Sequence, residues 1–167
     1  MDPIVKKLTD FLATIAIPFE LRSIECATFL PGLCLEHGKL LIDLDKLKYP
    51  GDILHEAGHI AVCEPKERHL LHGDVFKFGT QHGRKPGNMH GEEMAATAWA
   101  VAAIQYLQLP LELVFHEAGY RGASNNLIEA FARGDGFGFP LLNAWLMTDE
   151  ERGYPHMQRW VREVSWA

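Results

Sequence analysis

The chain has 167 residues, of which 47% are hydrophobic and 23% are charged, and its formal net charge is −6. A chain of this length can bury a core of its own, so we expect one domain over residues 1–167. The negative charge, with no basic patch, argues against a nucleic-acid binder. No stretch approaches the ~20 consecutive apolar residues of a membrane span, so no membrane partner is expected.

The N-terminus and the cysteines indicate a cytoplasmic location. Residues 1–7 lack the basic and then apolar layout of a signal peptide. Cys26, Cys34 and Cys63 are odd in number and form no CxxC motif. We interpret them as reduced thiols, with Cys63 packed near a helix end.

The first third of the chain predicts one helix followed by strands. Residues 3–16 carry hydrophobic side chains at helical spacing, which predicts an amphipathic helix. Residues 24–30 and 33–44 are typical of short strands. Pro31-Gly32 and His37-Gly38 are typical of the turns that would join them.

The most informative motif is HExxH, spelled by residues 55–59 inside a hydrophobic run. We expect a helix here, with Asp52 as its N-terminal cap. Residues four apart lie on one helix face, so His55 and His59 can direct two imidazoles at a single metal ion. Glu56 stands beside that face, where a carboxylate can take a proton from metal-bound water.

HExxH also occurs by chance, and the alternative is an amphipathic helix with two surface histidines. The hydrophobic neighbours argue against an exposed helix, and a buried helix excludes two histidines and a glutamate unless they are paired or bind metal. Gly58 costs about 1 kcal/mol relative to Ala inside a helix, which is explained if another element packs closely there. Two neutral imidazoles suit Zn²⁺, which then needs a third ligand.

A second helix, expected over residues 91–108, offers that ligand. Glu92 and Glu93 stand at its predicted start, where the helix dipole alone would favour negative charge. The small side chains of Ala96 and Ala100 allow a close approach to the HExxH helix, and Glu93 shares their face. We therefore predict Glu93 as the third ligand and Glu92 as the second choice. Behind them stand the histidines of the preceding connection, His69, His72, His82 and His90.

These motifs together resemble the small gluzincin-type metallopeptidases, most closely the ImmA/IrrE-like group. In that group the HExxH helix is followed by a helix that opens with E-x-x-A-N-x-F-A and runs towards L-x-P. Residues 93–100 match this pattern with Thr97 in place of the Asn, and Leu109-Pro110 closes the helix. Residues 32–43 resemble the strand pair that precedes the active-site helix. The resemblance implies a zincin-like fold and a peptide or protein substrate.

The rest of the chain is described by its expected elements and by further candidate residues. The expected elements are a possible strand at 75–78, helices at 111–118, 124–133 and 141–147, a loop at 134–140, and a tail that docks through Trp160 and Trp166. Residues 114–120 echo the HExxH segment but end in Tyr120, so we expect no second site there. Candidates for stabilising an oxyanion are the connection histidines with Tyr120, Arg121, Tyr154 and His156.

We therefore expect an α+β, zincin-like and mostly helical fold, with a small N-terminal antiparallel sheet packed on the HExxH helix. The predicted function is that of a zinc metallopeptidase. His55, His59 and Glu93 would hold Zn²⁺, and Glu56 would act as general base. The alternative is a non-catalytic zinc-binding domain that keeps the site and works with a regulatory protein partner.

Overall fold

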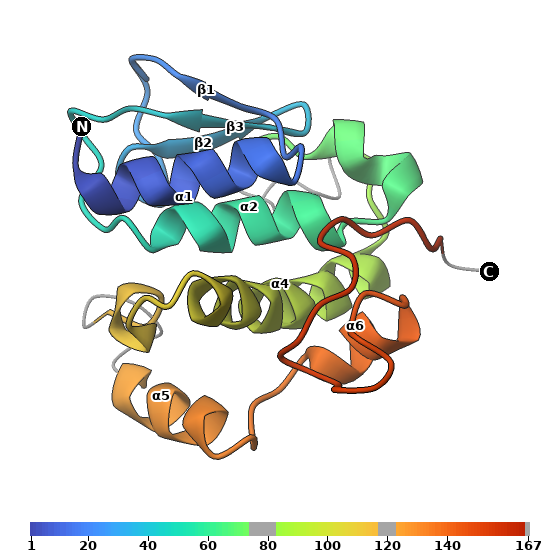
Figure 1. Ribbon diagram of the computed structural model, residues 1–167. Coiled ribbons are helices and arrows are strands. Elements are labelled where there is room, and N and C mark those ends of the chain that lie inside the picture. The colour runs from blue at the N-terminus through green and yellow to red at the C-terminus, as the bar shows by residue number, and fades with distance from the viewer. Residues whose placement is uncertain (74–82, 117–122, 166–167) are drawn as a thin grey trace.

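The computed structural model describes residues 1–73, 83–116 and 123–165. The fold is α+β, as predicted, with a small sheet on one side and helices stacked below it (Figure 1). Helices α1 (Pro3–Thr14) and α2 (Asp52–Val62) lie next to the sheet. Helix α4 (Pro86–Tyr106) forms the next layer, followed by α5 (Ser124–Ala132) and α6 (Phe139–Ala144).

The sheet is mixed, which corrects the prediction of an antiparallel sheet. Its strands are β1 (Phe19–Leu21), β2 (Leu33–Glu36) and β3 (Lys39–Ile42), in the order β1-β3-β2. Strands β2 and β3 form the expected antiparallel hairpin around His37-Gly38, but β1 runs parallel to β3.

Residues 24–30 are not the strand that their hydrophobic content predicted. Both edges of β3 are already paired, with β1 on one side and β2 on the other, so this segment has no free edge of that strand to join. The chain crosses instead as a loop, in which Phe29 is 81% exposed. The buried carboxylate of Asp43 holds the loop by accepting a hydrogen bond from the Ile24 backbone N–H at 2.9 Å.

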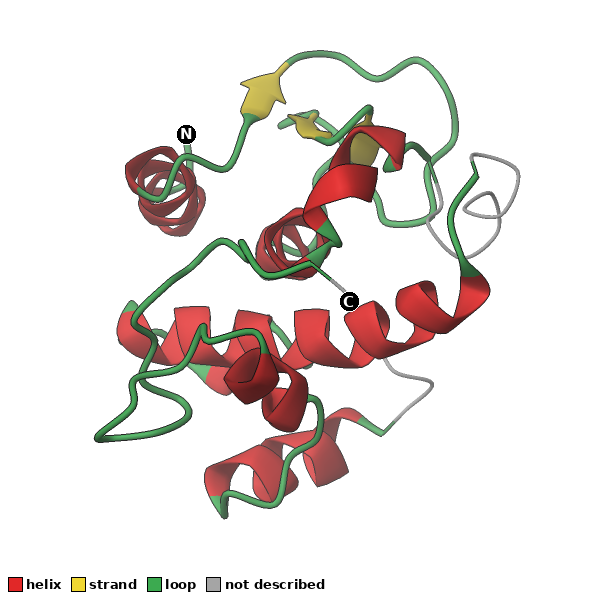
Figure 2. Ribbon diagram, turned by 90° about the vertical axis from the view of Figure 1, so that its right-hand side faces the viewer, coloured by secondary structure: helices red, strands yellow, loops and turns green. Residues whose placement is uncertain are grey.

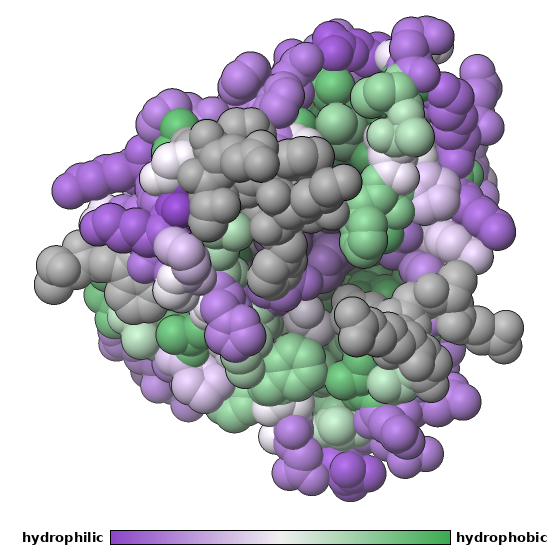
Figure 3. All heavy atoms as spheres, turned by 180° about the vertical axis from the view of Figure 1, so that it is seen from behind, coloured by the Kyte–Doolittle hydropathy of each residue, from purple (hydrophilic) through white to green (hydrophobic). Residues whose placement is uncertain are grey.

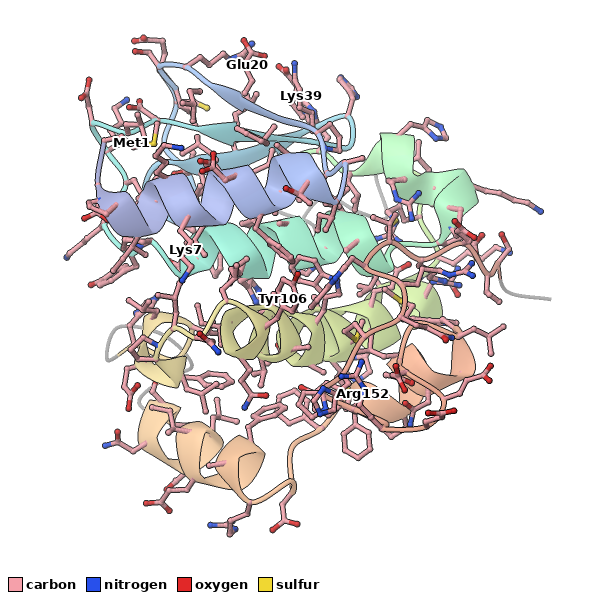
Figure 4. All side chains as sticks on the ribbon, viewed as in Figure 1. Met1, Lys7, Glu20, Lys39, Tyr106 and Arg152 are labelled. Carbon is pink, nitrogen blue, oxygen red and sulfur yellow. The ribbon has the colours of Figure 1, made fainter. Side chains whose placement is uncertain are left out.

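The two faces of the sheet differ as expected for a half-buried sheet. Leu33, Leu35 and Leu40 are buried and belong to the core, which extends from the sheet past α1 and α2 to α4 and α6. On the sheet, Glu20 of β1 and Lys39 of β3 point towards one another (Figure 4) and form an ion pair of 2.7 Å. The sheet therefore supports α2 from one side, as predicted for the HExxH helix.

Helices α2 and α4 make the most extensive contact between elements in the described ranges. In Figure 2, α1 and α2 are seen nearly end-on and α4 crosses beneath them. Gly58 lies at this contact: a Cβ atom there would stand 2.9 Å from the Ala96 carbonyl oxygen and 3.3 Å from the Trp99 ring. The close approach inferred from this glycine is confirmed, and it brings the two helices together beside the HExxH motif.

Two helix starts differ from the prediction. Gly51, not Asp52, is the N-cap of α2, and no side chain caps that end. Asp52 is instead the first residue of α2, and its carboxylate pairs with His116. Helix α4 begins at Pro86 rather than at residue 91, in keeping with the preference of proline for the first helical turn. Glu92 therefore lies well inside α4, beyond the first turn where the helix dipole acts.

The second half of the chain follows the prediction in part. Helix α5 matches the expected helix at 124–133, and α6 begins two residues before the expected 141. Of the helix expected at 111–118, the structure has a short 3-10 turn, Leu111–Leu113, and residues from 117 onwards lie outside the described ranges, as does the possible strand at 75–78.

The tail docks as expected, because Trp99 Nε1 donates to the Trp160 carbonyl oxygen at 2.9 Å. Trp166 lies outside the described ranges.

From behind, hydrophobic side chains gather in the middle of the face and hydrophilic ones surround them (Figure 3). Within the described ranges, no helix has both the length and the apolar character needed to cross a bilayer.

Candidate metal centre

Three of the predicted residues meet between α2 and α4. His59 Nε2 lies 2.9 Å from one carboxylate oxygen of Glu93, and His55 Nε2 lies 3.4 Å from the other. One ligand atom from each of the three residues falls within 4.8 Å of the others, and no other such group of histidine, cysteine or acidic side chains occurs in the described ranges. Spacing along α2 aligns the histidines, and the α2–α4 contact supplies the carboxylate.

The donor set suits a metal ion in both chemistry and spacing. Two imidazoles and one carboxylate are a known set for catalytic zinc, which keeps a fourth position open. With zinc–ligand bonds of about 2.0–2.2 Å, tetrahedral geometry separates ligand atoms by about 3.3–3.6 Å. The distance from Glu93 to His55, 3.4 Å, lies in this range, and the distance to His59, 2.9 Å, is shorter, as in a direct ion pair.

The cluster is buried on one side and accessible on the other. The His59 side chain is 7% exposed and that of His55 is 16% exposed, whereas that of Glu93 is 30% exposed. Exposure therefore rises from His59 through His55 to Glu93, and the core holds the histidines in place.

The opposite charges of Glu93 and the histidines shift the pKa values of Glu93 and His59. Burial by itself lowers the pKa of His59, but the charge and hydrogen bond of Glu93 outweigh it, so the pKa rises to about 9. Burial by itself raises the pKa of Glu93, but His59 and His55 outweigh it, so the pKa falls well below its usual range. Glu93 and His59 thus form an ion pair at neutral pH when no metal lies between them.

We expect zinc to bind more weakly as the pH falls below 9. A metal ligand histidine must be neutral, so binding expels the proton that His59 holds with a pKa of about 9. One released proton makes the apparent affinity fall about tenfold for each pH unit below that value. Competition titrations with a chromophoric chelator at pH 6.5, 7.5 and 8.5 measure this slope. An affinity that stays constant over this range contradicts the expected proton release.

The shifted pKa values of His59 and Glu93 also make the stability of the metal-free protein depend on pH. Because the pKa of His59 is raised above its ordinary 6.5, its contribution is complete below about pH 6.5 and is lost as the pH rises through 9. The pKa of Glu93 is lowered below its ordinary 4.5, so its contribution is present above that value and is lost in acid.

Glu56 lies on α2 between the two histidines and is partly buried. Burial raises its pKa, against the opposing effect of His59 and His55. In the described ranges, no side chain or backbone N–H is bonded to its carboxylate. A carboxylate with a raised pKa and, among the described residues, no hydrogen-bond partner suits the predicted role of general base.

Glu92, the second choice for the third ligand, contacts a different set of groups. Its carboxylate accepts a hydrogen bond from the Glu64 backbone N–H at 2.5 Å and forms ion pairs with Arg84 and Arg162. It therefore does not take part in the histidine cluster.

Cys63, at the C-terminal end of α2, is fully buried in the core as predicted, and burial raises its pKa to about 12.

The remaining candidates that lie within the described ranges are not brought to the cluster. His69 and His90 are exposed, and the His72 ring stacks on His37 with centroids 4.4 Å apart. The Tyr154 hydroxyl donates to the Ala98 carbonyl oxygen of α4 at 2.8 Å, and His156 is exposed. Of the other candidates, His82, Tyr120 and Arg121 lie outside the described ranges.

Sequence reasoning missed one pair near the site. His116 Nε2 lies 2.7 Å from a carboxylate oxygen of Asp52, and its ring stacks on Tyr49 at 3.9 Å between centroids. Asp52 precedes His55 by one helical turn, and burial raises its pKa while His116 and then His55 oppose the rise. No local signal could reveal the pair, because its members are 64 residues apart.

The chain was compared with models of known families, with curated proteins and with solved structures. None of the three comparisons found a match. Function is therefore argued from the chemistry of the site, because a fold alone does not specify an activity.

Proposed function

We propose that this protein is a zinc-dependent metallopeptidase with a zincin-like arrangement. One observation carries the proposal: the two histidines of a HExxH helix and a glutamate of the next helix converge within 4.8 Å of one another. The same helix carries Glu56 beside them. The motif resemblance to gluzincin-type peptidases supports the same assignment of roles.

The proposed mechanism divides the chemistry between the metal and the chain. When bound, Zn²⁺ would polarise a carbonyl and lower the pKa of water towards ~7. His55, His59 and Glu93 would hold it, and the core around α2 and α4 fixes their orientation. Glu56 would accept the proton of the attacking water and pass it to the leaving amine.

The accessible side of the cluster supports a substrate that approaches from outside. Glu93 is the most exposed of the three ligands, and a peptide would reach a metal held by the cluster from the side of this residue. The Asp52–His116 pair, one turn before His55, adds a third, partly buried imidazole near this end of α2. We expect a peptide or an unfolded protein segment as substrate.

The proposal is tested by metal content and by chelator-sensitive cleavage. Protein purified without a histidine tag is expected to contain one zinc ion per chain. It should cleave an unfolded protein or members of a peptide library, lose this activity with a chelator, and regain it with added Zn²⁺. A protein that binds none of the ions Zn²⁺, Co²⁺ and Mn²⁺ would contradict the proposal. Tight zinc binding without cleavage of any substrate favours the non-catalytic regulatory domain.

A further inference from the structure

A second cluster of charges lies buried next to the metal centre, and the proposed reaction does not use it. Its four members are almost inaccessible: the side chains are 2% exposed for Glu92, 1% for Arg84, 0% for Arg162 and 6% for Glu64. Burying this many charges is costly unless each is paired and hydrogen-bonded. Among these four, two carboxylates face two guanidinium groups, and Arg84 also pairs with the less buried carboxylate of Glu67 at 3.7 Å.

Glu92 joins helix α4 to the C-terminal end of α2. One of its oxygens accepts the hydrogen bond of the Glu64 backbone N–H, just after α2 ends. Its other oxygen pairs with Arg84, two residues before α4 begins. Glu92 therefore has partners in the segment that follows α2 and in the segment that precedes α4, the two helices that carry the metal ligands.

Arg162 brings the C-terminal segment into the same cluster. Its backbone N–H donates to the Ala61 carbonyl oxygen at 2.8 Å, and Nη1 donates to that of Val62 at 3.1 Å. These carbonyls belong to the last turn of α2, where helix carbonyls lack partners within the helix. Arg162 also pairs with Glu64 at 3.2 Å and with Glu92 at 3.6 Å.

We propose that Glu92, held by Arg84 and Arg162, is a positioning residue that sets α4 so that Glu93 faces the two histidines. The proposal rests on the metal site of the proposed function. Neighbouring residues on a helix point about 100° apart, so a rotation of α4 that moved Glu93 from the histidines would also pull Glu92 out of its buried pairs. Through Arg162, the C-terminal segment helps to fix the positions of the two helices that carry the metal ligands.

The test is zinc affinity and cobalt geometry in Glu92→Gln. The amide keeps the size of the side chain and can still accept from the Glu64 N–H, but it loses the charge that Arg84 and Arg162 pair with. We expect zinc affinity to fall by about 10-fold, the lower end of the range typical for groups bonded directly to a ligand, because Glu92 acts through the placement of α4 and contacts no ligand itself. The visible spectrum of the Co²⁺-loaded variant should differ from that of the wild type, because the spectrum reports ligand geometry.

Asp43→Asn is the matched control. It also removes a buried carboxylate with a backbone partner, but directly after β3 and away from the buried charge cluster. It should lower stability against urea without changing zinc affinity or the Co²⁺ spectrum. If Glu92→Gln also lowers stability and leaves both metal readouts unchanged, Glu92 is structural only and the proposal is overturned.

Arg162→Lys provides a second test if Glu92→Gln does not fold. Lysine keeps the positive charge but lacks the planar fork of arginine, so it cannot hold the Val62 carbonyl and Glu64 together. We expect a weaker zinc affinity here as well, and an unchanged affinity overturns the proposal. A wild type that binds no metal would refute the proposed function itself. A wild type that binds metal, together with variants of unchanged affinity, would overturn only the role of Glu92.

Discussion

His59→Ala is expected to abolish tight zinc binding, weakening it by at least about 10³-fold, or ~4 kcal/mol. His59 is the most buried of the three ligands and lies nearest to Glu93. Two ligands that remain cannot close the site. Competition with a chelator measures the loss directly. Thermal unfolding gives a second measure, because zinc at 1,000 times its Kd stabilises the wild type by about 4 kcal/mol and should not stabilise the variant.

His90→Ala is the control for this prediction. His90 also belongs to a ligand-bearing helix, α4, but its side chain is exposed and lies outside the cluster. It should bind zinc as the wild type does. Full zinc occupancy in His59→Ala would show that the metal is bound at another place in the protein.

Glu56→Gln is expected to keep the metal and to lower peptide hydrolysis by about 10²- to 10⁴-fold, the usual contribution of a general base. The side chain keeps its size and is not one of the three grouped ligands, so zinc affinity and fold should be unchanged. The amide cannot accept the proton of the attacking water. The measurement is the initial rate of cleavage with equal zinc occupancy in wild type and variant.

Glu129→Gln serves as the control, since it changes a carboxylate on α5 that is 70% exposed and should leave the rate unchanged. Cleavage that survives in Glu56→Gln at the wild-type rate refutes the proposed mechanism. A loss of zinc in Glu56→Gln would instead mean that this carboxylate supports the metal rather than the reaction.

The parts of the site that could be predicted from the sequence depend on local geometry. The spacing of His55 and His59 places them on one face of a helix whatever surrounds it. Gly58 indicated a close neighbour, and the Ala96 backbone is that neighbour. Glu93 could be chosen over Glu92 because its face of α4 carries the small residues that such a contact needs, and the structure brings Glu93 to the histidines.

The same local reasoning failed where the partner of a residue is distant in sequence. Residues 24–30 have the composition of a strand, but β1 and β2 occupy both edges of the central strand β3, and the segment crosses as a loop bonded to the Asp43 carboxylate. Asp52 has the side chain of a helix cap, but His116 binds its carboxylate. Composition reports what a segment can do, and long-range pairing decides which possibility is realised.

The sequence by itself therefore determined the helix that carries the candidate ligands and the residues that could complete the set. Only the tertiary structure decided how those helices are held. Arg162 reaches Glu64 and Glu92 across 98 and 70 positions of the chain. A lone charge in a sequence indicates solvent exposure, because burial is costly. That cost is offset here by partners from three separate segments, and such partners meet only when the chain has folded.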